Sequence, residues 1–170
     1  MGLTVEQNAL FRRIQHFSFD AGPVELPFHL RLARDNEWSA GFTARAITEY
    51  RRFALLAATA GHPVSPSDPV DQVWHLHLLY TESYWQRFCQ GGLGVQLHHH
   101  PGTGGGAERD KFNSWYADTL NSYRRCFDAE PPGDIWPAAG DQLNAFTAFK
   151  RVNIRQCWIV QKPRLTGGSI

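Results

Sequence analysis

The stretch DPVDQVWHLHLLYTESYWQRF, residues 68–88, decides the fold class of this chain. Asp68 is a good N-cap residue, and Pro69 suits the first turn of a helix, where a missing N–H costs no hydrogen bond. Apolar residues then recur at helical spacing, with no glycine and no second proline among them. The pattern predicts one helix from Asp68 to about Phe88.

One side of this predicted helix is apolar and the other is polar. The apolar side carries Val70, Val73, Trp74, His77, Tyr80, Tyr84 and Phe88, and the other side carries Asp71, His75, Leu79 and Glu82. Because an α-helix turns by about 100° per residue, His75 and His77 point about 200° apart and cannot bind one ion together. In a strand they would share a face, but the capping residues and the length of the stretch favour a helix.

The rest of the chain is also predicted to be mainly helical. Helix-start residues followed by helically spaced apolar residues predict five further helices: residues 4–14, a helix opened by Pro23, residues 39–60, a helix from about Ala107, and residues 143–151. Residues 90–106 are rich in glycine and histidine and predict an irregular loop. We therefore expect an all-α protein, an irregular bundle of about five or six helices with little or no sheet.

Length, composition and charge narrow the classes of protein. A chain of 170 residues with 42% hydrophobic residues fits a single helical domain, residues 1–170, with a tail over about 152–170. A net charge of +1 argues against nucleic acid and anionic membranes as partners. The sequence has no signal-type or membrane-spanning apolar run, and three widely spaced cysteines, Cys89, Cys126 and Cys157, predict free thiols rather than disulfides. We expect a cytoplasmic protein.

A second group of histidines lies in LHHHPGTGGGAE, residues 97–108. A loop bearing His98, His99 and His100 can turn at least one imidazole back toward the central helix, and neutral imidazoles bind zinc, iron or copper. Glu108 follows in the first turn of the next predicted helix, where it could be a metal ligand or a general base. It could also be an ordinary first-turn acid that complements the helix dipole.

Each of these features also has a simpler interpretation. His77, alone among aromatics, fits a hydrogen-bonded core residue as well as a metal ligand. Asp71 lies one turn before His75 and could orient its ring beside a metal or form an ordinary helical pair. The glycines before Glu108 could expose N–H groups to an anion or phosphate, although the Lys-Ser/Thr ending of a P-loop is missing.

Four segments together resemble the glycine-rich domain-containing protein-like family: EYRRF, PVSPSDPVDQVWHLHLLYTESYW, LHHHPGTGGGAERDKFNSWY and PPGDIWP. The likeness covers about residues 28–137 and centres on VDxVWHxHLL followed by LHHxP. The matching positions are Asp71, Trp74, His75, His77, His98, His99, Pro101, Glu108, Phe112 and Trp115. That family has no defined biochemical activity, so the resemblance implies a shared helical fold and shared histidine positions.

These observations predict a small protein that binds a divalent transition metal, iron, zinc or copper. The expected metal ligands are either His75 or His77, whichever faces the loop, together with one or two of His98 and His99, and Glu108 is a further candidate. If the protein is an enzyme, we expect an oxidase, oxygenase or hydrolase of a small organic substrate, with Asp71, Glu108, Tyr80 and Tyr84 as its catalytic and pocket-lining residues. The alternatives are a non-catalytic helical interaction module with a buried His/Trp network, or a protein that binds an anion at the glycine-rich loop.

Overall fold

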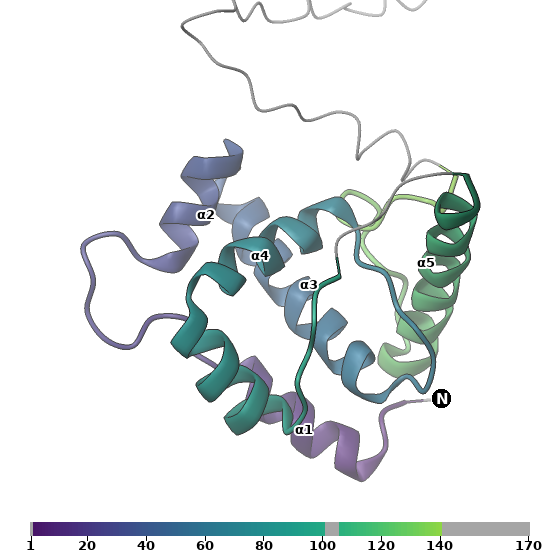
Figure 1. Ribbon diagram of the computed structural model, residues 1–170, viewed down its shortest axis with the longest axis horizontal. Helices are drawn as coiled ribbons and strands as arrows, with labels where there is room; N and C mark the ends of the chain where they lie inside the picture. Colours follow the sequence, from purple (N-terminus) through teal and green to yellow (C-terminus); the bar gives the residue numbers. More distant parts are fainter. Residues whose placement is uncertain (1, 101–105, 141–170) are drawn as a thin grey trace, which may run out of the picture.

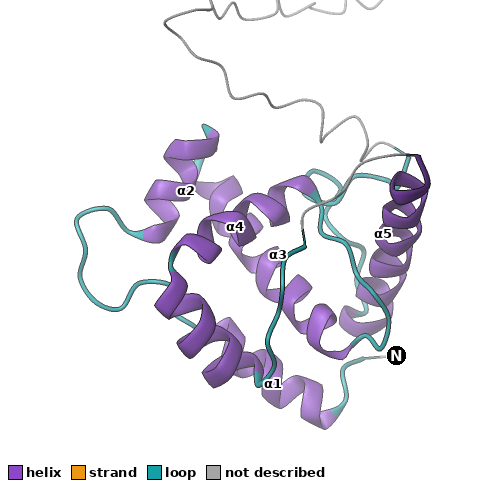
Figure 2. Cartoon of the chain, in the orientation of Figure 1, coloured by secondary structure: helices purple, strands orange, loops and turns teal. Residues whose placement is uncertain are grey.

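The computed structural model describes residues 2–100 and 106–140, which form six helices and no strand (Figures 1 and 2). The helices are α1 (Val5–Gln15), α2 (Phe28–Asn36), α3 (Ala40–Thr59), α4 (Asp68–Leu79), η1 (Ser83–Leu93) and α5 (Gly106–Phe127). The predicted all-α class is confirmed. The helix expected at 143–151 and the tail at 152–170 lie outside the described residues, and the single domain over 1–170 stays a prediction.

Helix α3 is the centre of the bundle, and it contacts all five of the other helices (Figure 1). Ser39 caps it as expected, because its hydroxyl accepts a hydrogen bond from the N–H of Phe42 at 3.2 Å. Its buried residues include Ala46, Tyr50, Phe53, Ala54, Leu55 and Leu56. Because so many apolar side chains of α3 are buried, this helix gives the shorter helices a common surface to pack on.

Two helix starts differ in how well the sequence predicts them. Thr4 and Gln7 form the expected capping box of α1, with Thr4 N–H donating to Gln7 Oε1 at 3.0 Å. The start of α2 at Pro23 was wrong, since the helix begins at Phe28. The reason is a carboxylate eight residues away: both oxygens of Asp20 accept from the Phe28 N–H, at 3.1 and 3.2 Å, and so replace a local cap.

The predicted continuous helix through Phe88 was also wrong, because the chain breaks after α4 ends at Leu79. Tyr80 leaves the helical region with ψ of 63°, and its N–H donates to the carbonyl of His77 at 3.0 Å. The chain then continues as η1, a π-helix. Gly94 caps its C-terminal end in a left-handed backbone conformation. The break turns the start of η1 back toward the side chain of His77.

The segment 94–100 brings the second group of histidines back to the central helix. It leaves the end of η1 and runs along the bundle in extended form (Figure 1). Its last residues reach the first turns of α4, as the contact between His99 and Asp71 shows. Two stretches that are more than twenty residues apart in sequence therefore meet beside the first turns of α4.

Candidate metal centre

The two histidines of α4 occupy opposite environments, as their helical spacing predicts. His77 is fully buried, whereas 49% of the His75 side chain is exposed. The apolar side of α4 is buried through Val70, Val73, Trp74, Leu76 and His77. His75 therefore projects from the side of α4 that faces segment 94–100. Of the two histidines, it is His75 that faces the loop.

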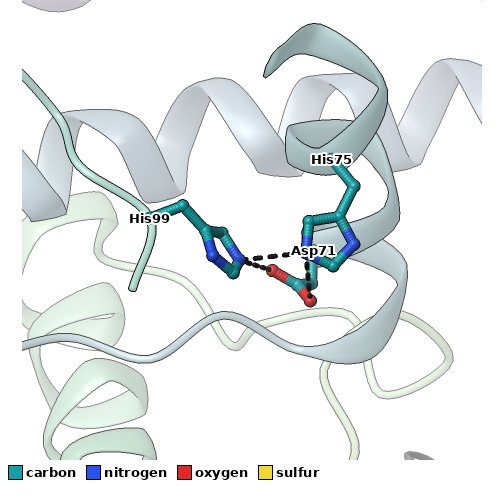
Figure 3. A group of neighbouring side chains, drawn as sticks. All are labelled: Asp71, His75 and His99. Carbon is teal, nitrogen blue, oxygen red and sulfur yellow. Dashed lines mark hydrogen bonds and ion pairs between the residues drawn. The ribbon is translucent and has the colours of Figure 1, made fainter. Parts of the chain in front are cut away.

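Asp71, His75 and His99 form a compact group in which each residue contacts the other two (Figure 3). The Nε2 atom of His99 lies 2.9 Å from Asp71 Oδ1 and 3.1 Å from Nε2 of His75. The Nε2 atom of His75 lies 3.5 Å from Asp71 Oδ2. Two imidazole nitrogens and one carboxylate thus point toward a common centre.

The spacing of these atoms matches that of ligands around one transition metal ion. Zinc binds histidine nitrogen and carboxylate oxygen at about 2.0 to 2.2 Å, so two atoms bound to one ion lie about 3.0 to 3.5 Å apart. The contacts in the group, 2.9, 3.1 and 3.5 Å, fall close to this range, although each histidine is nearest to a different oxygen of the Asp71 carboxylate. The group therefore fits a metal ion with little movement of its side chains.

The hydrogen bonds of this arrangement share one donor between two acceptors. In neutral imidazole each nitrogen is either a donor or an acceptor, so His99 Nε2 has at most one hydrogen to share between Asp71 and His75. If that hydrogen points at the Asp71 carboxylate, His75 Nε2 can accept it only as the second acceptor of a shared hydrogen bond. A cation would instead attract all three lone pairs at once.

Helix α4 fixes the positions of Asp71 and His75 relative to one another. They are four residues apart on α4, so their side chains lie one above the other on the same face. Only 14% of the Asp71 side chain and 21% of the His99 side chain are exposed. A largely buried carboxylate between two imidazoles needs a positive partner more than a solvated one does.

A hydrogen-bond relay that the sequence did not reveal holds His99 in place. The Trp74 indole N–H donates to the hydroxyl of Tyr84 at 2.8 Å, and that hydroxyl donates to the carbonyl of Leu97. The Trp74 ring also packs edge-on against His99, with 4.6 Å between ring centroids. Tyr84, which we expected to line a pocket, thus fixes the backbone two residues before His99, and burial raises its pKa above the ordinary value.

His77 forms a separate network inside the core. Ser83 Oγ donates to the carbonyl of Phe19 at 2.9 Å, so it can accept the Nε2–H of His77 at 3.4 Å. Nδ1 of His77 then accepts from the Tyr50 hydroxyl at 3.0 Å. Burial, together with Arg87 and Arg51, lowers the pKa of His77 to about 3, so the ring is neutral at pH 7. Both ring nitrogens have protein partners, and His77 lies outside the Asp71 group.

The other predicted site residues are His98, Tyr80 and Glu108. The His98 ring is exposed, packs near Trp85 with 5.3 Å between centroids, and has Nε2 3.3 Å from Gln96 Oε1. Tyr80 is half-buried and packs edge-on against Phe28. Glu108 is half-buried in the first turn of α5 and is not among the clustered ligands. Residues 101–105, most of the glycine-rich turn, lie outside the described residues.

Within the part of the chain that the structure describes, no helix has the length and apolar character needed to cross a membrane.

Comparisons with known proteins add a family but no function. Searches of curated proteins and of solved structures gave no match. A comparison with protein families matches residues 12–127 to a family described as UCP032817-like, a range that runs from the last turn of α1 to the end of α5. The resemblance to the glycine-rich domain-containing protein-like family is not tested by this match and stays a prediction. Since the match covers more than half of its length, the chain belongs to the UCP032817-like family.

Proposed function

We propose that this protein binds one divalent transition metal ion through Asp71, His75 and His99. The observation that carries the proposal is the convergence of two imidazole nitrogens and one carboxylate from two distant segments, with contacts of 2.9 to 3.5 Å between neighbouring residues. Helical side-chain pairing accounts for Asp71 and His75 but not for His99, which is brought in by a separate segment. The Tyr84 relay supports the proposal because it fixes that segment at the required place.

Two imidazoles and one carboxylate are a donor set for iron(II) or zinc. Three protein ligands leave coordination positions open to water or to a substrate, which is the arrangement of catalytic rather than structural sites. When bound, such an ion would supply Lewis acidity and, in the case of iron, redox chemistry. The half exposure of His75 supports access from solvent. We propose a metal-dependent enzyme, an oxygenase or a hydrolase, acting on a small organic molecule.

The first test is the metal content of the protein purified without an affinity tag. Elemental analysis after reconstitution with iron(II) under argon, or with zinc, should give about one ion per chain. Replacing any ligand, as in Asp71→Asn, His75→Gln or His99→Gln, should reduce that value strongly, because each removes one of three bonds to the ion. A wild-type value well below one ion per chain for both metals would refute the proposal.

The second candidate function is a helical interaction module without a metal. The observation that favours it is the Tyr50–His77–Ser83 network, which shows that a histidine of this helix serves the core. It predicts that the Asp71 group is also a hydrogen-bonded cluster and that its substitution changes stability independently of metal. Metal titration monitored by thermal unfolding separates the two, since only a binding site raises the melting temperature with metal concentration.

A further inference from the structure

A pocket of about 440 Å³ adjoins the candidate metal centre in the region between α2 and α4. It is lined by Asp35, Asn36, Gln72, His75, Leu76, Leu78 and Leu79. This volume lies within the range of small-molecule sites, about 300 to 1,000 Å³. His75 belongs both to this wall and to the metal group, so the pocket and the metal group adjoin at this residue.

The apolar part of the pocket consists of three leucines. Leu76 is buried and Leu78 is half-buried, whereas Leu79 is 74% exposed despite its large apolar side chain. An organic molecule that covered Leu79 would remove this apolar surface from water. The occupant is therefore expected to be largely apolar along this wall.

The polar part of the pocket offers hydrogen-bond acceptors. The Asn36 amide donates from Nδ2 to the carbonyl of Leu32 at 3.0 Å, and the Gln72 amide donates from Nε2 to Asp68 Oδ1 at 3.4 Å. These bonds orient the amides so that Oδ1 of Asn36 and Oε1 of Gln72 remain acceptors, with no protein donor among residues 2–100 and 106–140. Asp35 adds a carboxylate whose charge is offset by Arg34, 2.8 Å away.

We propose that this pocket binds the substrate of the metal centre, a small and largely apolar molecule with a hydrogen-bond-donating end such as an alcohol or a primary amine. The inference rests on the proposed function, because only a metal at Asp71, His75 and His99 makes the occupant a substrate. Gln72 is the specificity-determining residue of this proposal. It follows Asp71 directly on α4, so its position relative to the ion is fixed by the helix.

Two isomeric probes test the pocket without identifying the natural substrate. Benzyl alcohol and anisole have the same atoms and the same ring, but only the alcohol has an O–H donor. Each is titrated into metal-free, isotopically labelled protein, and the backbone amide signals are followed by NMR. We expect saturable shifts at Gln72, Leu78 and Leu79, with benzyl alcohol binding about fivefold more tightly, the effect of one hydrogen bond of about 1 kcal/mol.

Variants then assign the preference to one side chain. Gln72→Leu keeps the size of the residue but removes the acceptor, so it should abolish the fivefold preference for the alcohol. Gln90→Leu, at an exposed position of η1, is the matched control and should preserve it. Equal affinity for the two isomers in the wild type would overturn the proposed donor preference, and an absence of saturable shifts at the pocket would overturn the pocket itself.

A zinc titration of the same samples distinguishes this failure from failure of the proposed function. Zinc binding without binding of either probe would refute the pocket and leave the metal centre intact. Probe binding in a protein that takes up neither zinc nor iron(II) would refute the role of the occupant as the substrate of a metal centre. Binding of both supports the two proposals together.

Discussion

The Nε2 atoms of His75 and His99 lie 3.1 Å apart, although the two residues are separated by 24 positions in the sequence. Both nitrogens also face the carboxylate of Asp71. Close contact between two imidazole nitrogens is favourable only when a proton or a cation lies between them. This relationship connects the break after α4, the course of segment 94–100 and the proposed chemistry. It underlies the first three predictions, and the fourth concerns His77 in the core.

The first prediction compares two neighbouring histidines of the same segment. His99→Gln should weaken zinc binding at least tenfold, because it removes a ligand nitrogen that contacts both Asp71 and His75. His98→Gln is the matched control and should change the affinity little, since His98 lies outside the group. Isothermal titration calorimetry measures both. Equal losses in the two variants would indicate that zinc binds the histidine run as a flexible cluster.

The second prediction concerns the relay that positions His99. Tyr84→Phe removes the hydroxyl that joins Trp74 to the carbonyl of Leu97, and it leaves the buried indole N–H without its partner. We expect the free energy of unfolding to fall by about 1 to 3 kcal/mol and zinc affinity to fall as well. Urea unfolding and calorimetry measure the two effects. Tyr80→Phe is the control for the loss of a phenol hydroxyl, because Tyr80 is a half-buried tyrosine between α4 and η1.

Unchanged zinc affinity in Tyr84→Phe, alongside lower stability, would show that the relay supports the fold alone. The segment 94–100 would then reach Asp71 through other contacts, among them the packing of the Trp74 ring against His99.

The third prediction is stabilisation by metal. A ligand that binds only the folded state at a hundred times its dissociation constant adds about 2.7 kcal/mol. For a chain of this length that corresponds to a rise in melting temperature of roughly 5 to 10 °C. Asp71→Asn, which has nearly the same shape but no negative charge, should lose most of this rise. A zinc-dependent rise of the same size in the variant would place the ion elsewhere.

The fourth prediction is a pH dependence of stability that originates in the core. The pKa of His77 is about 3 in the folded protein, below its ordinary value of 6.5, because burial disfavours the charged ring. Between these two values the unfolded chain binds the proton and the folded protein does not. This contribution is therefore complete above pH 6.5 and is lost as the pH falls toward 3, by at most about 1.4 kcal/mol per pH unit.

Urea unfolding of metal-free protein at several pH values measures this slope. His77→Gln should lower the free energy of unfolding at pH 7. It should also reduce the slope of this free energy against pH between pH 6 and pH 4, by the equivalent of up to one bound proton. His29→Gln, at an exposed position, should leave the slope almost unchanged. A His77→Gln protein with the slope of the wild type would contradict a neutral buried His77.

The sequence predicted those features that depend on local signals. The helical class, the Thr4 capping box and the Ser39 cap follow from residues within a few positions of one another. The opposite placement of His75 and His77 follows from helical geometry, which holds because the break comes only after Leu79. The metal hypothesis depended on the same local reasoning together with the run of histidines after Leu97.

Features that depend on distant contacts could not be predicted from local patterns. The break at Tyr80 has no proline or glycine to mark it, and the start of α2 depends on Asp20, eight residues earlier. Asp71 was expected as a catalytic residue that could orient His75 or form a helical pair with it, and not as a metal ligand. Its carboxylate also contacts His99, which only the path of segment 94–100 brings near. The Trp74–Tyr84 bond likewise joins α4 to η1 across the break.

Crystallography of the zinc-loaded protein, with anomalous diffraction measured on both sides of the zinc absorption edge, locates the ion itself. We expect one anomalous peak per chain, at about 2.0 to 2.2 Å from Nε2 of His75, Nε2 of His99 and a carboxylate oxygen of Asp71. A peak bound instead to His98 or His100, or no peak beside Asp71 at saturating zinc, would contradict it.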